Sequence, residues 1–322
     1  MENQNEGANF IPVMPGSVGG KTRVTGLIGY PVEHTKSPLI HNTLAASFGD
    51  DLVYVPFCVR PEEIENAVKG AFALNIAGLN VTVPHKSAVI PYLTDIDPLA
   101  RCVGAVNTLV RTDEGFKGYN TDLPGLSHAM QKAGFTVEGE NILILGAGGA
   151  ARAAAFLCAS QKPAKLLIAN RTADKAEKIM EDIRSSDFSD GSGKQGAEEM
   201  VFKAVALTDL AKEMGSERFL AIQCTSVGLS PNDTDCVIDP DSVQGKEIFD
   251  KVYGGVDLIY KPAETVFLKE IRKRGGKTMN GLAMLLYQGV IAYELFTGRW
   301  TGQISASQEV LDALLAKMNE DN

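Results

Sequence analysis

The sequence predicts an α/β fold with two domains: an α/β substrate domain, and a doubly wound, Rossmann-type domain that binds a dinucleotide. Short apolar strands alternate with helices along most of the chain, which is typical of this fold class. A glycine-rich turn at 146–150 joins an apolar strand to an Ala-rich helix, as dinucleotide-binding folds require. The length of 322 residues, 44% of them hydrophobic, suits two domains of ordinary globular composition.

The composition limits the kinds of molecule that the protein is expected to bind and the compartment in which it is expected. A formal net charge of −9 argues against a nucleic-acid or anionic-membrane partner, because an acidic surface repels both. No run of about 18 apolar residues is present, so we expect no transmembrane helix. The five Cys residues are scattered without a C-x-x-C motif, which indicates a reducing compartment, and we expect the cytoplasm. The four His residues show no metal-binding spacing, so we expect no metal.

The first domain is expected to begin after a leader. Residues 1–22 are rich in Gly and Asn and are expected to be disordered, and Thr25–Tyr30 is the first apolar strand. Ser37 as N-cap and Pro38 at the first helical position predict a helix that ends near Phe48. The remaining elements of this domain are expected to be a strand at Asp51–Phe57, a helix at Pro61–Leu74, a strand at Ile76–Val83, short helical pieces at Val89–Leu93 and Pro98–Arg101, and a hairpin of Ala105–Arg111 with Gly115–Tyr119.

The second domain is expected to follow with a βαβ unit. A helix at Leu123–Ala133 ends at Gly134. The βαβ unit and the next helix are expected at Asn141–Leu145, Ala150–Ser160, Lys165–Ala169 and Lys175–Arg184. A surface loop at Ser185–Glu198 is followed by expected strands at Val201–Ala206, Leu220–Cys224, Glu247–Asp250 and Val256–Ile259, and then by helices at Leu282–Thr297 and Ser307–Met318.

The C-terminal helices are expected to return to the first domain. The substrate domain is therefore predicted as residues 23–122 plus 282–322. The dinucleotide-binding domain is predicted as residues 123–281.

The glycine-rich turn has the residues that a pyrophosphate site needs. Gly146 allows the tight turn, and Gly148 lets the backbone approach the phosphates. Ala151 takes the third position of the fingerprint, where a small residue permits close packing of helix on strand. The N–H groups at the start of the helix point at the phosphates. A glycine turn without any ligand is the alternative interpretation of this motif. The residues assigned to the cofactor in this turn are Gly146, Ala147, Gly148, Gly149 and Ala150.

The end of the second strand predicts the type of cofactor. An NAD-preferring site usually carries an Asp or Glu there, but this chain has Asn170, Arg171 and Thr172, with Lys175 three residues on. Two cations and a hydroxyl suit a 2′-phosphate, so we predict NADP. The alternative, a helix with Thr172 as its N-cap and a solvated Lys175, is compatible with this prediction.

Two earlier segments place a Lys and an Asp among hydroxyl and amide side chains. The first is Asn80-Val81-Thr82-Val83-Pro84-His85-Lys86, and the second is Gly118-Tyr119-Asn120-Thr121-Asp122. Beside a dinucleotide motif, such a pair indicates the reduction of a ketone on a small polyhydroxylated acid. An exposed Lys/Asp ion pair without function is the alternative.

With these motifs in order, the chain resembles shikimate dehydrogenases, including their shikimate/quinate dehydrogenase relatives. The resemblance runs from about Gly26 to Gly298 and leaves out the leader and the loop at Ser185–Glu198. Besides the motifs above, it rests on Gly29-Tyr30-Pro31, His34-Thr35-Lys36-Ser37-Pro38, Gly104-Ala105-Val106-Asn107-Thr108, Asp257-Leu258-Ile259-Tyr260, Met284 and Gln288.

The resemblance implies a reaction and a set of site residues. The reaction is the reversible NADP-linked reduction of 3-dehydroshikimate to shikimate, with Lys86 as acid/base group and Asp122 holding Lys86 and a ring hydroxyl. It implies that the substrate carboxylate is bound by Thr35, Ser37 and Tyr260. It implies that the ring hydroxyls are bound by Asn80, Thr82, Asn107, Asp122 and Gln288. Thr225, Leu258 and Gly281 are further assigned to the cofactor site.

Two departures from the family pattern leave alternatives open. Thr35 stands where the family usually has Ser, and its methyl group crowds the carboxylate end, where quinate differs from shikimate. Asn280 stands where many members have Asp. The alternatives are a quinate/shikimate dehydrogenase with relaxed substrate or NAD use, a folate-linked dehydrogenase, and a non-catalytic ligand-sensing regulator on the same fold. We expect a monomer or a homodimer.

Overall fold

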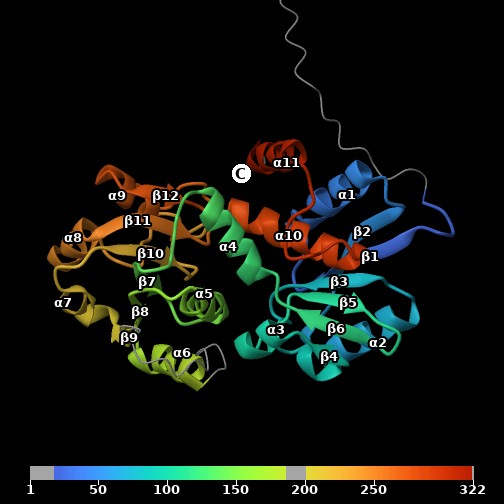
Figure 1. Ribbon diagram of the computed structural model, residues 1–322, viewed down its shortest axis with the longest axis horizontal. Coiled ribbons are helices and arrows are strands. Elements are labelled where there is room, and N and C mark those ends of the chain that lie inside the picture. Colours follow the sequence, from blue (N-terminus) through green and yellow to red (C-terminus); the bar gives the residue numbers. More distant parts are fainter. Residues whose placement is uncertain (1–17, 186–200, 321–322) are drawn as a thin grey trace, which may run out of the picture. The chain divides into compact units, whose positions relative to one another are not determined.

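The computed structural model describes residues 18–185 and 201–320 (Figure 1). Within them the chain forms two compact units. The first unit comprises residues 18–97, 106–119 and 289–320, and the second comprises 98–105, 120–185 and 201–288. Most of the predicted leader, and the predicted surface loop from residue 186 on, lie outside the described residues. The limits predicted for the substrate and dinucleotide domains are functional assignments and stay predictions.

The first unit contains a mixed six-stranded sheet. Strand β1 runs parallel to both β2 and β3, whereas β5 runs antiparallel to β3 and β6. The strands in their order across the sheet are β2 (Leu52–Cys58), β1 (Arg23–Gly29), β3 (Gly78–Val81), β5 (Thr108–Arg111), β6 (Phe116–Tyr119) and β4 (Asp95–Ile96). The short strand β4 was not predicted, because two residues are too few for an alternating pattern.

Helices from both ends of the chain pack in the first unit. They are α1 (Ser37–Phe48), α2 (Ile64–Ala73) after a 3₁₀ turn at Pro61–Glu63, a 3₁₀ turn at Ile90–Tyr92, the second half of α10 (Leu282–Thr297), and α11 (Gln308–Glu320). Ala292 and Phe296 of α10 share a core with Leu27 and Tyr54. The C-terminal helices therefore return to the first unit, as predicted.

Helix α1 starts one residue earlier than its predicted cap implied. Ser37 is the first helical residue, and the residue before it, Lys36, makes no side-chain cap. The hydroxyl of Thr35 instead accepts a hydrogen bond from the Ser37 N–H at 3.2 Å. Thr35 therefore satisfies one of the unpaired N–H groups at this helix start, although it lies outside the helix.

The second unit contains a six-stranded sheet in which every pair is parallel. Its order is β12 (Lys277–Met279), β11 (Val252–Asp257), β10 (Phe219–Gln223), β7 (Asn141–Leu145), β8 (Lys165–Asn170) and β9 (Val201–Ala206). The chain reverses its direction of travel across the sheet between β7 and β10. This is the doubly wound topology that the glycine-rich turn predicted, and ligands of such sheets bind where the order reverses.

The helices of the second unit precede or connect the strands of this sheet. They are α3 (Pro98–Val103), α4 (Asp122–Lys132), α5 (Gly149–Ser160), α6 (Ala173–Ser185), α7 (Leu210–Met214) after a 3₁₀ turn at Leu207–Asp209, α8 (Val243–Asp250) and α9 (Val266–Lys273). Arg152 of α5 binds the last carbonyls of α3, donating to Cys102 O at 2.9 Å and to Val103 O at 2.6 Å. A guanidinium suits a helix C-terminus, because the unpaired carbonyls there carry partial negative charge.

One predicted strand is wrong. Glu247–Asp250 is not a strand but the last part of helix α8. The hydroxyl of Ser242 caps this helix by accepting from the Gly245 N–H at 2.9 Å, and Ile248 and Phe249 are buried on it. A window of four residues hid the helical period and the cap that precedes it.

The neighbouring strand β11 begins earlier than predicted, at Val252. Gly254 and Gly255 weaken the strand pattern in the sequence, because glycine is uncommon inside strands. Both are needed for packing. A Cβ at Gly254 would lie 2.8 Å from the Phe135 ring, and one at Gly255 would lie 2.4 Å from Ile271 Cδ1. The elements β12, α7 and α9 were not predicted either, since all three are short.

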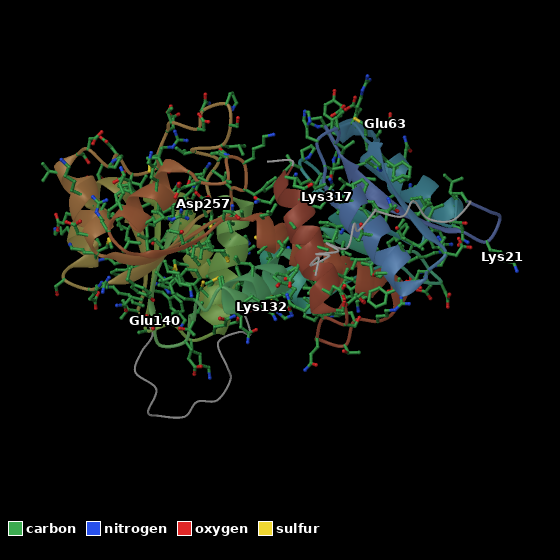
Figure 2. The ribbon with its side chains drawn as sticks, turned by 90° about the horizontal axis from the view of Figure 1, so that it is seen from above. Lys21, Glu63, Lys132, Glu140, Asp257 and Lys317 are labelled. Carbon is green, nitrogen blue, oxygen red and sulfur yellow. The ribbon has the colours of Figure 1, made fainter. Side chains whose placement is uncertain are left out.

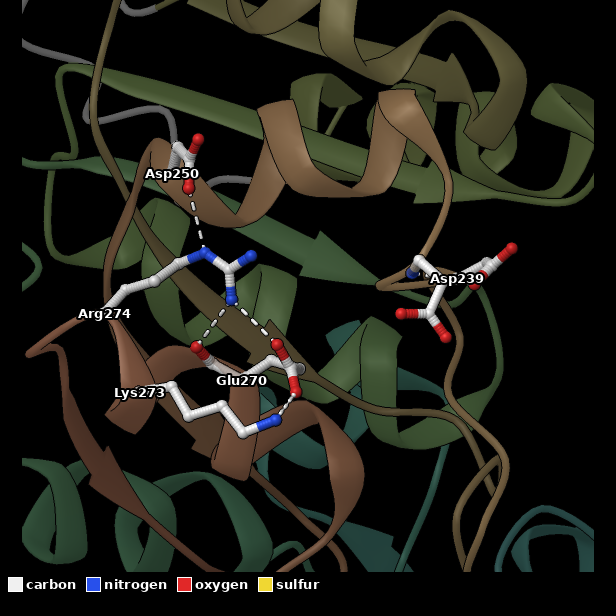
Figure 3. A network of polar contacts seen from close by, with 6 residues as sticks. Asp239, Asp250, Glu270, Lys273 and Arg274 are labelled. Atoms are coloured by element: carbon white, nitrogen blue, oxygen red, sulfur yellow. Dashed lines mark hydrogen bonds and ion pairs between the residues drawn. The ribbon is translucent and has the colours of Figure 1, made fainter.

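An ion-pair network joins the end of α8 to α9 (Figure 3). Arg274 donates from Nε to Asp250 Oδ1 at 2.9 Å and from Nη1 to Glu270 Oε2 at 2.8 Å, while Lys273 donates to Glu270 Oε1 at 2.5 Å. These two cations lower the pKa of Glu270. The pairs lie at the surface, so each contributes little to stability on its own.

Two helix-interior glycines give a matched test of the packing. A Cβ at Gly245 would lie 1.8 Å from Asp239 O, whereas a Cβ at Gly70 in α2 would have no atom within 4 Å. We expect Gly245→Ala to lower the free energy of unfolding by about 1–3 kcal/mol, because backbone must move. We expect Gly70→Ala to raise it by about 0.5–1 kcal/mol, because Ala favours helix. Urea unfolding measures both; equal effects of the two changes would contradict the packing described.

Candidate active site

The substrate residues predicted in the first unit lie near one edge of its sheet. Strands β1 and β3 are parallel, so their carboxyl ends are neighbours. Thr35 and Ser37 follow β1, and Asn80 and Thr82 lie at the end of β3. Asn80 pairs in register with Thr108, directly after Asn107, across the antiparallel β3–β5 ladder. The topology therefore gathers side chains that are far apart in sequence.

Three of these side chains are almost completely buried. Ser37, Asn80 and Asn107 are exposed by 8%, 5% and 3%. Buried amides and hydroxyls must find hydrogen-bond partners inside the protein or in a bound ligand. Their partners therefore indicate which role each residue can have.

The amide of Asn80 is held by three hydrogen bonds. Its Oδ1 accepts from the Tyr54 hydroxyl at 2.8 Å, and its Nδ2 donates to Asn107 O at 3.2 Å and to Thr108 Oγ1 at 3.0 Å. The Thr108 hydroxyl donates in turn to Asn107 Oδ1 at 3.0 Å. Asn80, Thr108 and Asn107 therefore form one connected chain of hydrogen bonds.

Two of the residues predicted for the substrate carboxylate, Thr35 and Ser37, are bonded to each other beside this chain. The Thr35 hydroxyl donates to Ser37 Oγ at 3.1 Å. Burial raises the pKa of the Tyr54 phenol, and a hydrogen bond with the Ser37 side chain partly offsets that rise. Ser37 therefore lies near the Tyr54 hydroxyl, which itself donates to Asn80.

Lys86 is presented by the loop that follows β3. Its backbone O accepts from the Val106 N–H at 2.8 Å, which ties this loop to the segment before β5. The preceding side chain, His85, is fully buried, and its Nε2 lies 2.7 Å from Val59 O. Lys86 itself is half-buried. The buried His85 side chain and the hydrogen-bonded backbone of Lys86 therefore fix the place from which the Lys86 side chain extends.

Asp122 and Gln288 belong to the second unit. Asp122 is the first residue of α4, where the helix dipole favours a carboxylate, and its N–H donates to Asn120 Oδ1 at 3.0 Å. Gly125, one turn on, lies against Gln288 of α10: a Cβ there would be 2.8 Å from the Gln288 backbone N. The structure therefore brings the residues Asp122 and Gln288 onto neighbouring helices. Lys86 and Asp122 lie in different units, and their pairing stays a prediction.

The glycine-rich turn has the geometry expected for phosphate binding. Gly146 has φ +113°, and a Cβ there would lie 2.9 Å from Thr225 Cγ2, so only glycine fits. A Cβ at Gly148 or Gly149 would meet no atom within 4 Å, so the space above the start of α5 is open. No side chain caps α5, and Ala151 is fully buried against the sheet. The first N–H groups of this helix can therefore bind an anion.

The predicted 2′-phosphate residues lie at the end of β8. Asn170 is its last residue, and its Nδ2 donates to Thr172 O at 3.0 Å, which fixes the turn into α6. Arg171, Thr172 and Lys175 are exposed. α6 begins at Ala173, directly after Thr172. One exposed segment therefore carries the cation Arg171 and the hydroxyl of Thr172 in the turn, and a second cation, Lys175, on α6.

The other predicted ligand residues of this unit lie on turns that buried polar groups hold. Gln223, fully buried, accepts from the Thr225 N–H and donates to Val227 O at 3.1 Å. Asp257, labelled in Figure 2, accepts from the Ile259 N–H at 2.9 Å and from the Thr265 hydroxyl at 2.6 Å. Its two bonds fix the turn that carries Leu258 and Tyr260.

Gly281 packs against the turn that carries Leu258. A Cβ at Gly281 would lie 2.2 Å from Leu258 O, and the Gly281 N–H donates to Ile259 O at 3.0 Å. The neighbouring Asn280, the departure from the family pattern, donates to Ala263 O at 2.9 Å and accepts from the Leu282 N–H at 3.1 Å. An Asp could not make the first of these bonds when ionised, so Asn280 supports this loop in a way that Asp would not.

A surface hollow in the second unit contains none of the predicted residues. Its volume is about 630 Å³, and its walls are the segment 227–241 and one face of α9. Glu270, one of its carboxylates, already pairs with Lys273 and Arg274. Across residues 18–185 and 201–320, no three His, Cys, Asp or Glu side chains are placed to share a metal ion. In that same part of the chain, no helix is both long and apolar enough to cross a bilayer.

Two family models match the chain. A shikimate dehydrogenase substrate-binding domain matches residues 27–109, and a shikimate / quinate 5-dehydrogenase domain matches residues 127–206. The shikimate dehydrogenase (NADP+) of Desulforamulus reducens is 40% identical over 301 residues, which are 93% of this chain and 98% of that protein. The chain belongs to the shikimate dehydrogenase family. The resemblance expected from the motifs is thereby confirmed, and members of this family are oxidoreductases that act on CH–OH groups.

Solved structures of the shikimate dehydrogenase family have the same fold. A shikimate dehydrogenase in complex with NADP+ superposes with a TM-score of 0.78 at 38% identity, covering 94% of this chain and 97% of that one. The Listeria monocytogenes shikimate 5-dehydrogenase, in complex with shikimate and NAD, gives a TM-score of 0.79 at 31% identity and covers 94% and 98%. The predicted two-domain α/β fold is confirmed.

Sequence reasoning missed the residues that support the site. They are buried polar side chains that contact other side chains or the backbone of a turn: Tyr54, Thr108, Asn120, Gln223 and Asp257. A polar residue at an inward position of an apolar strand is the signal that could have found Tyr54 and Gln223.

The buried Asp257 predicts a pH dependence of stability. Burial raises the pKa of Asp257 to about 6, from an ordinary value of 3.8 that the unfolded chain retains. Between these pH values the folded protein holds a proton that the unfolded chain has lost, so stability from this group falls as pH rises to about 6. We expect Asp257→Asn to become more stable relative to wild type, by on the order of 1–3 kcal/mol, between pH 4 and pH 7. Urea unfolding at both pH values measures this; a constant difference would contradict it.

Proposed function

We propose that this chain catalyses the reversible reduction of 3-dehydroshikimate to shikimate with NADPH, a step toward chorismate and the aromatic amino acids. One observation carries the proposal: the first unit gathers hydrogen-bonded hydroxyl and amide groups, most of them buried, at Thr35, Ser37, Asn80, Asn107 and Thr108. Neutral donors and acceptors suit a ligand with several hydroxyls and one carboxylate. The name of the Desulforamulus reducens relative, shikimate dehydrogenase (NADP+), supports the same substrate and cofactor.

The residues of the second unit fit NADP. The open space above Gly148 and the uncapped start of α5 suit a pyrophosphate. Arg171 and Lys175 suit the 2′-phosphate, which a carboxylate at the same place would repel. When bound, NADPH supplies the hydride that reaches the substrate carbonyl carbon. In this proposal Thr225, Leu258 and Gly281 line the rest of the cofactor site.

Lys86 is proposed to move the proton. Its ammonium donates a proton to the substrate carbonyl oxygen as that oxygen becomes an alcohol, and the neutral amine takes the proton back in the reverse direction. Asp122, at the N-terminus of α4, holds the ammonium and a ring hydroxyl. Thr35, Ser37 and Tyr260 bind the substrate carboxylate, while Thr82, Asn107 and Gln288 bind hydroxyls.

A quinate/shikimate dehydrogenase is the second candidate. The family model for the second domain covers both acids, and the Listeria monocytogenes structure contains NAD. Initial rates with shikimate and quinate, each with NADP+ and NAD+, separate the candidates. We expect the highest kcat/KM for shikimate with NADP+. A preference for quinate or NAD+ would favour the second candidate. Absence of turnover on either acid, together with binding, would favour a ligand-sensing regulator.

The location and assembly belong to this proposal as well. We expect a cytoplasmic monomer or homodimer without a nucleic-acid or membrane partner, in keeping with the net charge of −9.

The role of Lys86 predicts a loss of turnover. We expect Lys86→Ala to lower kcat by on the order of 100-fold or more, because no other group donates the proton. Lys69→Ala is the control, since Lys69 is exposed and pairs with Glu65 on α2; it should keep full activity. Steady-state shikimate oxidation measures both. A fully active Lys86→Ala variant would remove Lys86 from the mechanism.

The role of Arg171 predicts a change in cofactor preference. We expect Arg171→Ala to raise the KM for NADPH far more than that for NADH, because only NADPH carries the 2′-phosphate that Arg171 contacts. Lys178→Ala, an exposed change on the helix α6 that follows Arg171, should leave both values unchanged. Equal effects of Arg171→Ala on both cofactors would show that Arg171 does not recognise this phosphate.

A further inference from the structure

We infer that Lys36 is a positioning residue that ties the loop carrying Thr35 and Ser37 to the C-terminal end of helix α11. The inference rests on the proposed function, in which Thr35 and Ser37 bind the substrate carboxylate. It adds a helix that carries none of the predicted site residues to the parts of the first unit that set the affinity for substrate.

Lys36 occupies a place where a lysine is locally unfavourable. It is the N-cap residue of α1: its backbone O accepts from the Ile40 N–H at 3.3 Å, and its side chain makes no cap. N-cap positions favour Ser, Thr, Asp or Asn, and a helix N-terminus carries partial positive charge, which repels a cation. A residue that breaks local preferences in this way indicates a role elsewhere in the fold.

The Lys36 side chain has a partner at the end of α11. Its ammonium donates to Met318 O at 2.8 Å, in the last turn of that helix. The carbonyls of a last turn lack partners within their own helix and carry partial negative charge, so they favour a cation. Lys36 and Met318 are 282 positions apart, and only the fold brings them together.

Helix α11 is a fixed partner because its start and its inner face are held. Before the helix, the fully buried Glu294 of α10 accepts from the Ser305 N–H at 2.7 Å and from the Ser305 hydroxyl at 2.8 Å. Along the helix, Leu311, Leu314 and Met318 are buried, and α11 packs beside α1 (Figure 1). The carbonyl that Lys36 binds therefore has a defined position in the first unit.

The bond to Met318 acts on Thr35 and Ser37 through the backbone. Lys36 lies between these two residues, so a shift of its Cα moves both. Their hydroxyls are also bonded to each other at 3.1 Å, so they move as a pair. With the ammonium fixed at α11, this pair is ordered before the substrate arrives, and less entropy is lost when the carboxylate binds.

Removing the ammonium of Lys36 in the full-length protein tests the inference. We expect Lys36→Met to raise the KM for shikimate about 3- to 10-fold, a part of the worth of one charge-assisted hydrogen bond, with kcat and the KM for NADP+ within about twofold of wild type. Lys36→Arg should keep the KM for shikimate within about twofold of wild type, because a guanidinium also donates to helix C-terminal carbonyls. Steady-state oxidation of shikimate measures these constants.

Lys317→Met is the matched control. Lys317, labelled in Figure 2, precedes Met318 on α11, but it is exposed and pairs with Glu320 at 2.9 Å. The same exchange of an ammonium for a thioether at this position should leave the KM for shikimate unchanged.

A change in α11 itself tests whether the effect passes through that helix. Leu314→Ala loosens the buried face of α11 and leaves Lys36 in place. We expect it to raise the KM for shikimate as well. The double variant with Lys36→Met should raise the KM by less than the product of the two effects, because both changes act on one contact. If Lys36 instead bound the substrate carboxylate directly, Leu314→Ala would leave the KM unchanged, which would overturn the inference.

Hydrogen exchange provides a readout that needs no turnover. Coupling between two places is reciprocal, so saturating shikimate should slow amide exchange in residues 308–320 of the wild-type protein. Lys36→Met should lose this protection. These measurements on Lys36→Met provide the test if Leu314→Ala does not fold.

Other outcomes would also overturn the inference. A Lys36→Met variant that loses stability in urea but keeps the wild-type KM for shikimate would show a merely structural role. Exchange in α11 that shikimate does not change would show that the helix and the loop are not coupled. A wild-type enzyme that does not turn over shikimate would overturn the proposed function, and with it the inference.

Discussion

The hydrogen bond from the Tyr54 hydroxyl to Asn80 Oδ1 is the interaction on which the first unit's site depends. It lies where water does not reach, so each polar group around it must be paired within the protein or by a ligand. Pairing groups of fixed donor and acceptor character leaves few arrangements. The Asn80 amide, one of the predicted ligand residues, is therefore held in one orientation by its neighbours.

In the second unit, a further constraint is the close approach of backbone segments to one another. Gly146, Gly281 and Gly125 each occupy a place where a Cβ would come within 3 Å of another atom. At these places the turn after β7 lies against the turn after β10, the turn after β12 lies against the turn after β11, and α4 lies against α10. By contrast, a Cβ at Gly148 or Gly149 would meet no atom within 4 Å, so the start of α5 is open to a phosphate. Buried polar pairing also holds turns of this unit, at Gln223 and at Asp257.

Much of this architecture could be predicted from the sequence, for identifiable reasons. The strand Asn141–Leu145 and the helix Leu282–Thr297 were predicted to the residue, because both are long apolar runs that end at glycine or a helix cap. Glu247–Asp250 was misassigned because its cap, Ser242, lies outside a short window. The motifs identified the ligand residues but not their supports, since Tyr54 and Asn80 are 26 residues apart and only the fold joins them.

A crystal structure of the full-length protein with shikimate and NADP+ tests the central claim most directly. The account predicts Lys86 Nζ and the Asp122 carboxylate within hydrogen-bond distance of the hydroxyl whose carbon faces the nicotinamide. A Lys86 side chain directed away from the bound ring would contradict it.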